Sequence, residues 1–475
     1  MASLQHPFQC LQVAKRGSQG LPDVLIATAG RYLYAYNPTN GQRLDVWPQD
    51  VDSAESKAST AHVADDTAPP EKRRKLSSDS EGQEQKQTSN KKAPAWTAIP
   101  LTVTSSDGKY VVALTGEDKA IRVFELSMDS KFKELNSRVM PKRASALALT
   151  PDGQNIIIAD KFGDVYSIPL IPGEYVKKVI EAKPTGPSAT PLTVHTKGNL
   201  RTLELQKLHA ERLANAPPQE DDRLNFEHHT IIGHVSVLTD LLTVSLAGRN
   251  YILTGDRDEH IRVSRGLPQA HVIENFCLGH PTLVTKLCIP SWAPHLLVSG
   301  DGAGNLFLWD WRQGQTLHRI SIQETLQGEF MINGIWDISS DQANVILVGL
   351  EGSAQLLCYK LDEQGLQVQD TIQLSGNVLD LVGVNSSGSV FVSVDTLREA
   401  GSIDSWKPSS GALLESFQIT VGADGIKLSA TEDPVATNIN VVGTSHLPAD
   451  LNEKQKKDLN TSLYNLENLK KRAFD

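Results

Sequence analysis

Short apolar runs, separated by glycine-rich or charged turns, recur along this chain. Residues 253–265, LTGDRDEHIRVSR, contain an apolar run, a charged tetrapeptide and a second run in which apolar and polar residues alternate. Residues 298–310, VSGDGAGNLFLWD, repeat this arrangement 45 positions later. Because alternation with a period of two is typical of a half-buried β-strand, each stretch is expected to form two strands joined by a tight turn.

Comparable units fill most of the chain. They share an apolar run, a turn built on Asp-Gly or on charged residues, and a second short run. Gly233-His234 and Gly279-His280 open two of these units, 46 positions apart. The predicted units, in order, are 22–47, 100–126, 143–170, 233–265, 279–310, 336–359 and 378–416, the last with residues 401–406 as its final strand.

Repeats of about 40–45 residues with four short strands each are typical of a β-propeller with WD-type blades. A small four-stranded sheet cannot bury both faces alone, whereas blades packed face to face around an axis cover them. We therefore predict an all-β fold, a seven-bladed WD-repeat β-propeller, with six blades as the alternative. Trp309-Asp310 completes the WD signature, but the unit at 253–265 has Ser264-Arg265 there. Residues 8–13 are expected to supply a strand to the last blade and close the ring.

Composition divides the chain into ordered and low-order segments. Residues 50–95 are rich in Ser, Asp, Glu, Lys and Gln, and such a segment cannot bury enough apolar surface to offset the entropy of ordering it. The predicted organisation is 1–49 (closing strand and first blade), 50–95 (disordered charged insert), 96–173 (blades two and three), 174–229 (flexible insert), 230–420 (blades four to seven) and 421–475 (C-terminal extension with a short amphipathic helix).

Three features of the segments outside the predicted blades stand out. The insert at 50–95 contains EKRRKLSSDS at 71–80, a Lys-Arg-Arg-Lys cluster that indicates either a nuclear import signal or a solvated charge run. Residues 203–215 are loosely periodic in leucine and are a candidate helix. Leucines at near-helical spacing predict the C-terminal amphipathic helix; they are Leu451, Leu459, Leu463, Leu466 and Leu469.

Charge and cysteine content exclude several classes of protein. The chain has 46 Lys and Arg against 56 Asp and Glu, and its net charge of -10 argues against a globally basic nucleic-acid-binding protein. Its four cysteines are scattered without a CxxC pair, so we predict neither a disulfide framework nor a zinc site, and a reducing compartment fits. No apolar run approaches the ~20 residues that span a bilayer, so no membrane association is predicted.

The sequence contains no convincing catalytic constellation. The glycines of 300–304 match GxGxG, but a strand-like run follows them instead of the helix that a nucleotide-binding loop requires. His228 and His229 would point to opposite faces of a strand, which argues against a metal pair. His234 and His280 are expected to bond within their blades. We predict no enzyme activity, no cofactor and no metal, with an enzyme that uses the central pore as an open alternative.

Surface residues beside the charged turn are the candidates for partner binding. In the run Ile261-Arg262-Val263, the two apolar side chains point one way and Arg262 points the other. We expect Arg262 to lie on the outermost strand of its blade and to project from the flank of the propeller, with Arg257 and Asp258 on the adjacent turn. Arg122 occupies the same position in an earlier unit, so ordinary surface filling is the alternative interpretation.

Four segments carry a family resemblance. They are KRASALAL at 142–149, ADKFGDVYS at 159–167, GDRDEHIRVS at 255–264 and FCLGH at 276–280. Together they resemble the WD-repeat, non-catalytic subunit of the eukaryotic tRNA (guanine-N7-)-methyltransferase, and the long charged insert suggests a fungal member. The resemblance covers residues 142–310 closely and the other units only in general layout.

The resemblance implies a partner and a docking residue. A member of this family would bind a separate S-adenosylmethionine-dependent catalytic subunit as a heterodimer and support 7-methylguanosine formation in the tRNA variable loop, meeting tRNA mainly through that partner. A basic residue of the DRDExIR motif would meet an acid on the catalytic subunit, at Arg262 here, with Lys161 and Arg257 as further candidates. The expected location is the nucleus. A general WD-repeat scaffold, such as a ubiquitin-ligase substrate adaptor or a chromatin-complex subunit, is the alternative.

Overall fold

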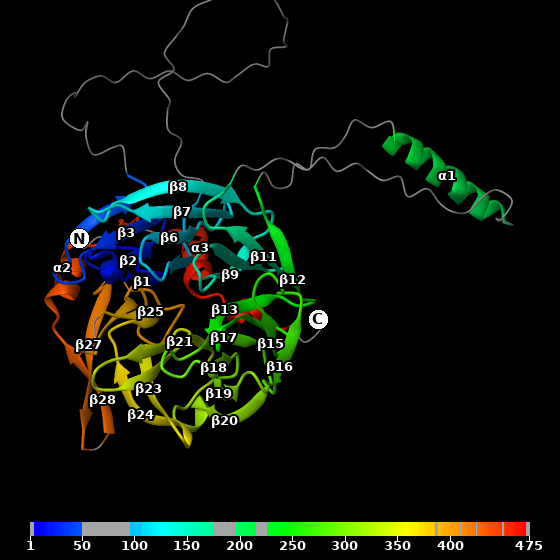
Figure 1. Cartoon of the computed structure of the whole chain (residues 1–475). Coiled ribbons are helices and arrows are strands. Elements are labelled where there is room, and N and C mark those ends of the chain that lie inside the picture. The colour runs from blue at the N-terminus through cyan, green and yellow to red at the C-terminus, as the bar shows by residue number, and fades with distance from the viewer. Residues whose placement is uncertain are drawn as a thin grey trace, which may run out of the picture.

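Seven antiparallel sheets of four strands are arranged as blades around a central axis (Figure 1). The computed structural model describes residues 4–49, 96–173, 196–214, 226–384, 388–407, 411–423, 425–448 and 451–471. Within these residues the fold is the all-β, seven-bladed propeller that the repeat pattern predicts. The predicted disordered insert at 50–95, with its candidate import signal, and most of the second insert lie outside the described residues.

The first four blades contain the N-terminal half of the chain. Blade one consists of β1 (Cys10–Ala14), β2 (Val24–Ala29), β3 (Tyr32–Tyr36) and β4 (Arg43–Trp47). Blade two consists of β5 (Leu101–Thr104), β6 (Tyr110–Leu114), β7 (Ala120–Leu126) and β8 (Phe132–Val139). Blade three consists of β9 (Ala144–Leu149), β10 (Asn155–Asp160), β11 (Asp164–Pro169) and β12 (His229–Gly233). Blade four consists of β13 (Leu238–Leu246), β14 (Arg249–Asp256), β15 (His260–Arg265) and β16 (Ile273–Leu278).

The last three blades and three helices complete the described structure. Blade five consists of β17 (Val284–Cys288), β18 (Leu296–Asp301), β19 (Asn305–Asp310) and β20 (Gln315–Ser321). Blade six consists of β21 (Ile332–Ser339), β22 (Asn344–Leu350), β23 (Gln355–Asp362) and β24 (Gly365–Gln373). Blade seven consists of β25 (Asn377–Gly383), β26 (Ser389–Asp395), β27 (Leu414–Gly422) and β28 (Gly425–Thr431). The helices are α1 (Lys197–Ala214), α2 (Pro434–Val442) and α3 (Glu453–Leu463).

The ring closes differently from the prediction. β1 pairs with β2 and is the innermost strand of blade one, so the N-terminal run does not add a strand to the last blade. The fourth strand of blade seven is β28, which pairs with β27. Residues 401–406, predicted as the last strand, instead contribute an isolated bridge between Arg398 and Trp406. Blades one and seven instead meet face to face, where Leu11 N–H donates to Asp380 Oδ2 (2.7 Å).

The second insert interrupts a blade and does not separate two blades. β12, which follows the insert, pairs with β11 and is the outer strand of blade three. Residues 174–229 are predicted as a flexible insert between blades three and four, because a strand that returns to its sheet after about 60 residues leaves no local signal in the pattern. Part of the candidate helix at 203–215 is confirmed, since α1 extends to Ala214.

A buried polar network inside blade five explains its complete WD signature. His280 Nδ1 lies 3.3 Å from Asp301 Oδ2, and His280 Nε2 lies 2.7 Å from Ser299 Oγ. Trp309 Nε1 donates to the same hydroxyl (2.8 Å). His234 makes the matching contacts in blade four, with Thr254 at 2.9 Å and Asp256 at 3.4 Å. The two histidines therefore bond within the propeller, as predicted, and tie the loop before each blade to its core.

Candidate functional site

Arg262 lies on the third strand of blade four, not on the outermost one. The strand order is β13-β14-β15-β16, and Arg262 is in β15, where it pairs with Phe276 of β16. The predicted alternation is confirmed, because Ile261 and Val263 are fully buried while Arg262 is on the opposite face. The predicted edge position is wrong because β16, which begins after a seven-residue connection, forms the outer edge of the blade.

The guanidinium of Arg262 is held in place by uncharged partners. Its Nε donates to Ser264 Oγ (3.0 Å), and its Nη1 donates to the carbonyl oxygen of Gly233 (3.2 Å), at the end of blade three. Ser264 occupies the position that Trp309 occupies in blade five. The departure from the WD signature therefore supplies a hydroxyl that orients Arg262.

Arg122, at the same position in blade two, has a different environment. It pairs with Asp118 Oδ2 (2.9 Å) and Glu134 Oε1 (2.8 Å), and its guanidinium carbon lies 4.2 Å from the centre of the Trp96 ring. Within the described residues, no carboxylate lies within ion-pair distance of Arg262. Arg122 is thus paired with acidic groups of its own chain, whereas Arg262 is oriented by uncharged groups and has no counter-charge among the described residues.

Exposed apolar side chains surround Arg262. Phe276 and Leu278 lie on the same face of β16, with exposed fractions of 38% and 57%. Phe162, on the turn between β10 and β11, is 66% exposed, and Val235 is exposed directly after β12. His234 N–H donates to the carbonyl oxygen of Gly163 (2.8 Å), which joins the segments that carry Phe162 and Val235. We call Phe162, Val235, Arg262, Phe276 and Leu278 the blade three–four flank.

A group of exposed apolar side chains on neighbouring segments is typical of an interaction surface. No role is predicted for these apolar residues from the sequence, although Phe276 and Leu278 lie in FCLGH, one of the segments that carry the family resemblance. Alternation within β16, where Cys277 is buried between two exposed apolar residues, is the signal that could have indicated the patch.

Lys161 and Arg257 occupy equivalent positions in blades three and four. Each follows a buried aspartate at the end of a strand, and their backbone N–H groups donate to Arg143 O (3.2 Å) and Val237 O (2.9 Å). Burial, reinforced by the charge of Arg143, lowers the pKa of Lys161. Lys161 and Arg257 are not among the five residues of the blade three–four flank.

Asp258 already has a partner within the chain. Its carboxylate lies 3.1 Å from Lys471 Nζ, and Glu259 lies 3.8 Å from the same ammonium. Burial is the largest influence on the pKa of Asp258 and raises it, but the hydrogen bond and charge of Lys471, the Ser236 hydroxyl and the charge of Arg257 together lower the pKa below its usual value. The structure thus places Arg257, Asp258 and Arg262 in one hairpin and Lys161 on the neighbouring blade. It also places Lys471 beside the turn of that hairpin, a contact that the sequence did not predict.

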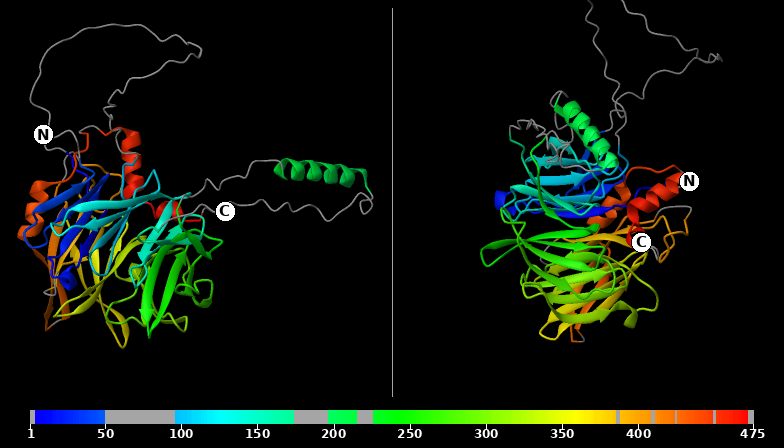
Figure 2. Two further views of the ribbon diagram at one scale, coloured as in Figure 1. Left: turned by 45° about the horizontal axis from the view of Figure 1, so that its top comes forward. Right: turned by 90° about the vertical axis from the view of Figure 1, so that its right-hand side faces the viewer.

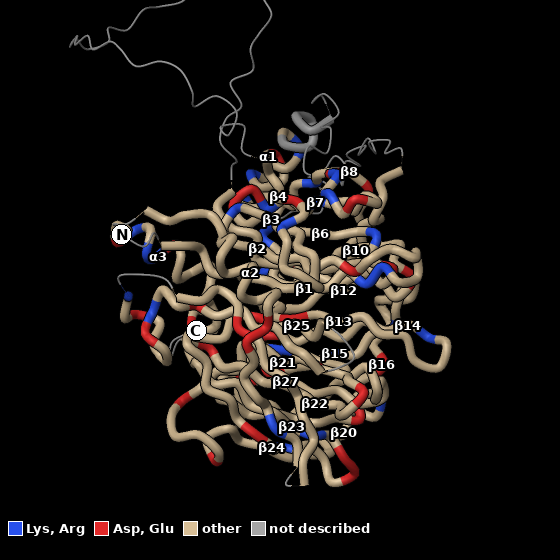
Figure 3. The backbone as a smooth tube through the Cα atoms, turned by 90° about the vertical axis from the view of Figure 1, so that its left-hand side faces the viewer, with Lys and Arg blue, Asp and Glu red and all other residues tan. Residues whose placement is uncertain are grey.

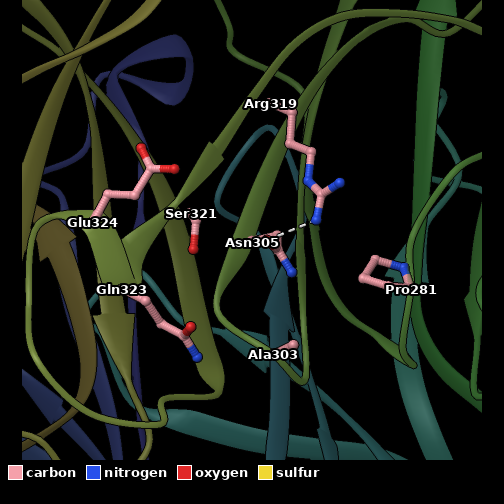
Figure 4. A pocket seen from close by; sticks show the side chains of 7 residues that line it. All are labelled: Pro281, Ala303, Asn305, Arg319, Ser321, Gln323 and Glu324. Carbon is pink, nitrogen blue, oxygen red and sulfur yellow. Dashed lines mark hydrogen bonds between the residues drawn. The ribbon is translucent and has the colours of Figure 1, made fainter.

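A polar cavity of about 530 Å³ lies in blade five. It is lined by Pro281, Ala303, Asn305, Arg319, Ser321, Gln323 and Glu324 (Figure 4). Arg319 Nη2 donates to Asn305 Oδ1 (3.2 Å), and Asn305 Nδ2 donates to Asp301 Oδ2 (2.9 Å). Arg319, Asn305 and Asp301 are bonded to one another, and Ser321 and Glu324 supply the hydroxyl and the carboxylate of the lining.

Two further features are the distribution of charged residues and the length of the helices. Basic and acidic residues are interspersed over the blades seen in Figure 3. None of the helices in the described ranges is both long and apolar enough to cross a membrane.

Comparisons with known proteins place the chain in a family. Residues 25–419 match the tRNA methyltransferase TRM82 WD40 domain. The tRNA (guanine-N(7)-)-methyltransferase non-catalytic subunit trm82 of Aspergillus oryzae is 45% identical, with 99% of each chain covered. Its counterpart in Aspergillus clavatus is 43% identical, covering 99% of this chain and 98% of its own.

Solved structures support the fold alone. U3-55K aligns with a TM-score of 0.53 at 15% identity, covering 90% of this chain and 96% of its own. The RRP9 WD40 repeats align with a TM-score of 0.53 at 14% identity, covering 91% and 99%. The sequence matches are far closer than these and extend over the whole propeller. The chain therefore belongs to the family of WD-repeat non-catalytic subunits of tRNA (guanine-N7-)-methyltransferase.

Proposed function

We propose that this chain binds a separate catalytic tRNA (guanine-N7-)-methyltransferase subunit as a heterodimer, through the blade three–four flank, and supports 7-methylguanosine formation in tRNA. The names of its relatives describe non-catalytic subunits, which implies a catalytic partner. The observation that carries the docking site is Arg262, which is held by Ser264 and Gly233 but has no acidic partner in the described part of the chain.

The environment of Arg262 suits an ion pair across an interface. Two hydrogen bonds fix the guanidinium before the partner arrives, so little side-chain entropy is lost on binding. A carboxylate of the partner would form a charge-assisted hydrogen bond, which is stronger than a neutral one. Phe276 and Leu278 would exclude water around that pair, an arrangement typical of the most important residues in protein interfaces.

The propeller would act on the partner through binding energy and not through chemistry. A protein that binds only the folded, competent form of an enzyme raises the population of that form by mass action. With a net charge of -10, the propeller itself is poorly suited to bind many phosphates, so the catalytic subunit would supply most contacts to tRNA. Basic side chains near the C-terminus, such as Lys454 and Lys457, could add local ones.

The proposed location of the complex is the nucleus. The Lys-Arg-Arg-Lys cluster at 72–75 has the composition of a nuclear import signal. Replacing these four residues with alanine in a fluorescently tagged chain should move the protein to the cytoplasm. An unchanged distribution would assign the cluster to ordinary surface charge.

The docking proposal is tested by Arg262→Glu. The substitution places a glutamate opposite the proposed carboxylate of the partner and removes the ion pair that Arg262 would form with it. The dissociation constant for the catalytic subunit should therefore rise at least about 30-fold. Binding is measured by calorimetry, and 7-methylguanosine by nucleoside analysis of tRNA treated with the reconstituted pair. Arg249→Glu is the matched control, because Arg249 is exposed and lies at the opposite end of β14 from the turn that leads to Arg262.

The two possible failures have different meanings. If Arg262→Glu binds as tightly as the wild type, the blade three–four flank is not centred on this residue. If the wild-type chain neither binds the catalytic subunit nor increases tRNA methylation, the proposed function itself is wrong.

A further inference from the structure

The C-terminal segment, residues 451–471, runs over one face of the ring from blade seven to blade four. α3 and the end of the described chain lie on this face (Figure 2). Leu459 of α3 is buried against Leu4 and Leu397, and Leu463 and Trp406 pack around them. This apolar cluster anchors the beginning of the segment beside blade seven.

A buried polar network strengthens this anchor. Asp395 and Arg398 form an ion pair (2.5 Å) whose side chains are completely inaccessible to solvent. Tyr464 O–H donates to Asp395 Oδ2 (2.6 Å), and Arg398 Nε donates to Asn460 Oδ1 (3.1 Å). In blade five, His280 contacts the aspartate at the corresponding strand end, and in blade seven the C-terminal segment takes over that role. Breaking a buried pair of this kind is costly, so this end of the segment is held firmly.

The segment then makes a second firm contact, at blade six. Leu466 N–H donates to Glu351 Oε1 (2.9 Å). Glu351 has the position in its blade that Arg257 has in blade four, since both backbone N–H groups bond to the loop before the innermost strand, at Met331 O and Val237 O (both 2.9 Å). The segment is therefore directed along the ends of the blades toward the turn that contains Asp258.

The last contact is of a different kind. Lys471 meets Asp258 and Glu259 with side chains that are all exposed, with fractions of 46%, 37% and 41%. Exposed ion pairs favour their closed form by a factor of only about two to five, and salt weakens them further. The firm anchor and the weak end together make a segment that stays attached while its tip opens and closes.

We propose that Lys471 is a latch on the docking surface: its ammonium occupies the carboxylates of Asp258 and Glu259 until a cationic group of the bound partner protein takes its place. The inference rests on the proposed function. The two carboxylates lie on the turn that leads directly into β15, three to four residues before Arg262. A partner surface that carries an acid for Arg262 and a base beside it complements this hairpin, and it can bind fully only when Lys471 has left.

The test uses the full chain with Lys471→Gln, and Lys470→Gln as its matched control. Lys470 is the preceding residue and pairs with Glu467, within the segment itself (2.7 Å), so its substitution removes the same charge without opening the latch. Because the apparent affinity is the intrinsic affinity multiplied by the fraction of open molecules, Lys471→Gln should bind the catalytic subunit about three- to sixfold more tightly than the wild type. The gain should shrink at high salt, and Lys470→Gln should bind like the wild type.

A second measurement follows the segment directly. Amide hydrogen exchange at residues 467–471 of the wild-type chain should become faster when the catalytic subunit binds, while exchange in α3 should not change. Binding by Lys471→Gln that is weaker than, or equal to, that of the wild type would overturn the latch, as would slower exchange at 467–471 in the complex. Failure of all variants to bind the catalytic subunit would instead overturn the proposed function.

Discussion

The hydroxyl of Tyr464 offers a quantitative test of how the C-terminal segment is anchored. Burial raises the pKa of Tyr464 well above its usual value, so the hydroxyl keeps its proton and donates to Asp395 Oδ2 (2.6 Å). Tyr464→Phe removes this bond and leaves the carboxylate with Arg398 Nη1 and the N–H of Leu397. A hydrogen bond to a charged group contributes about 1.5–3 kcal/mol, so α3 should open more easily by about 2 kcal/mol.

Amide hydrogen exchange of residues 453–463 measures this opening. Because 1.4 kcal/mol corresponds to a factor of ten, exchange in α3 should be about 30-fold faster in Tyr464→Phe than in the wild type. Tyr36→Phe is the control, since the Tyr36 hydroxyl is buried without a hydrogen-bond partner in the described structure and its removal should cost nothing. Equal exchange in Tyr464→Phe and the wild type would refute the argument that the buried network holds the segment.

Two further predictions concern the propeller itself. Burial lowers the pKa of His6 from 6.5 to about 4, so the unfolded chain takes up the proton first and the free energy of unfolding falls as the pH drops from about 6.5 toward 4. His6→Gln should flatten this dependence in urea titrations at several pH values, and an unchanged slope would contradict it. Gly334→Ala would place a Cβ 1.9 Å from the Trp336 ring and displace the indole that donates to Asp380 of blade seven (2.9 Å). The expected loss of about 1–3 kcal/mol should appear as a lower melting temperature with a red-shifted tryptophan emission, and a wild-type melting curve would show that blade six absorbs the change.

Much of the architecture could be predicted because its signals are local. Alternation in Ile261-Arg262-Val263 indicates which side chains face the core. The run of charged residues at 256–260 indicates that a turn lies there. The propeller architecture follows from the repeat, since packing successive four-stranded sheets against one another covers both faces of each. None of these inferences requires knowledge of which distant segments meet.

The misassigned strands were given the wrong sheet. β1 belongs to blade one and β28 to blade seven, where each pairs with its neighbour in sequence, β2 and β27, whereas β12 returns to β11 of blade three across the second insert. An alternating pattern fits any free edge equally well, whether that edge is near or remote in sequence. The pattern therefore indicated that strands exist without indicating their sheets.

The candidate site shows most clearly what the sequence determined and what the tertiary structure determined. The sequence by itself determined a seven-bladed repeat, a family resemblance and an outward-facing Arg262, because period and residue type are properties of a single strand. Only the tertiary structure distinguished Arg262 from Arg122, by placing Asp118 and Glu134 beside the latter and, within the part of the chain that the structure describes, the uncharged groups of Ser264 and Gly233 beside the former. It likewise brought Lys471 to Asp258 across more than 200 residues. The interaction between two charges depends on the distance between them in space, and for residues far apart in sequence only the folded structure gives that distance.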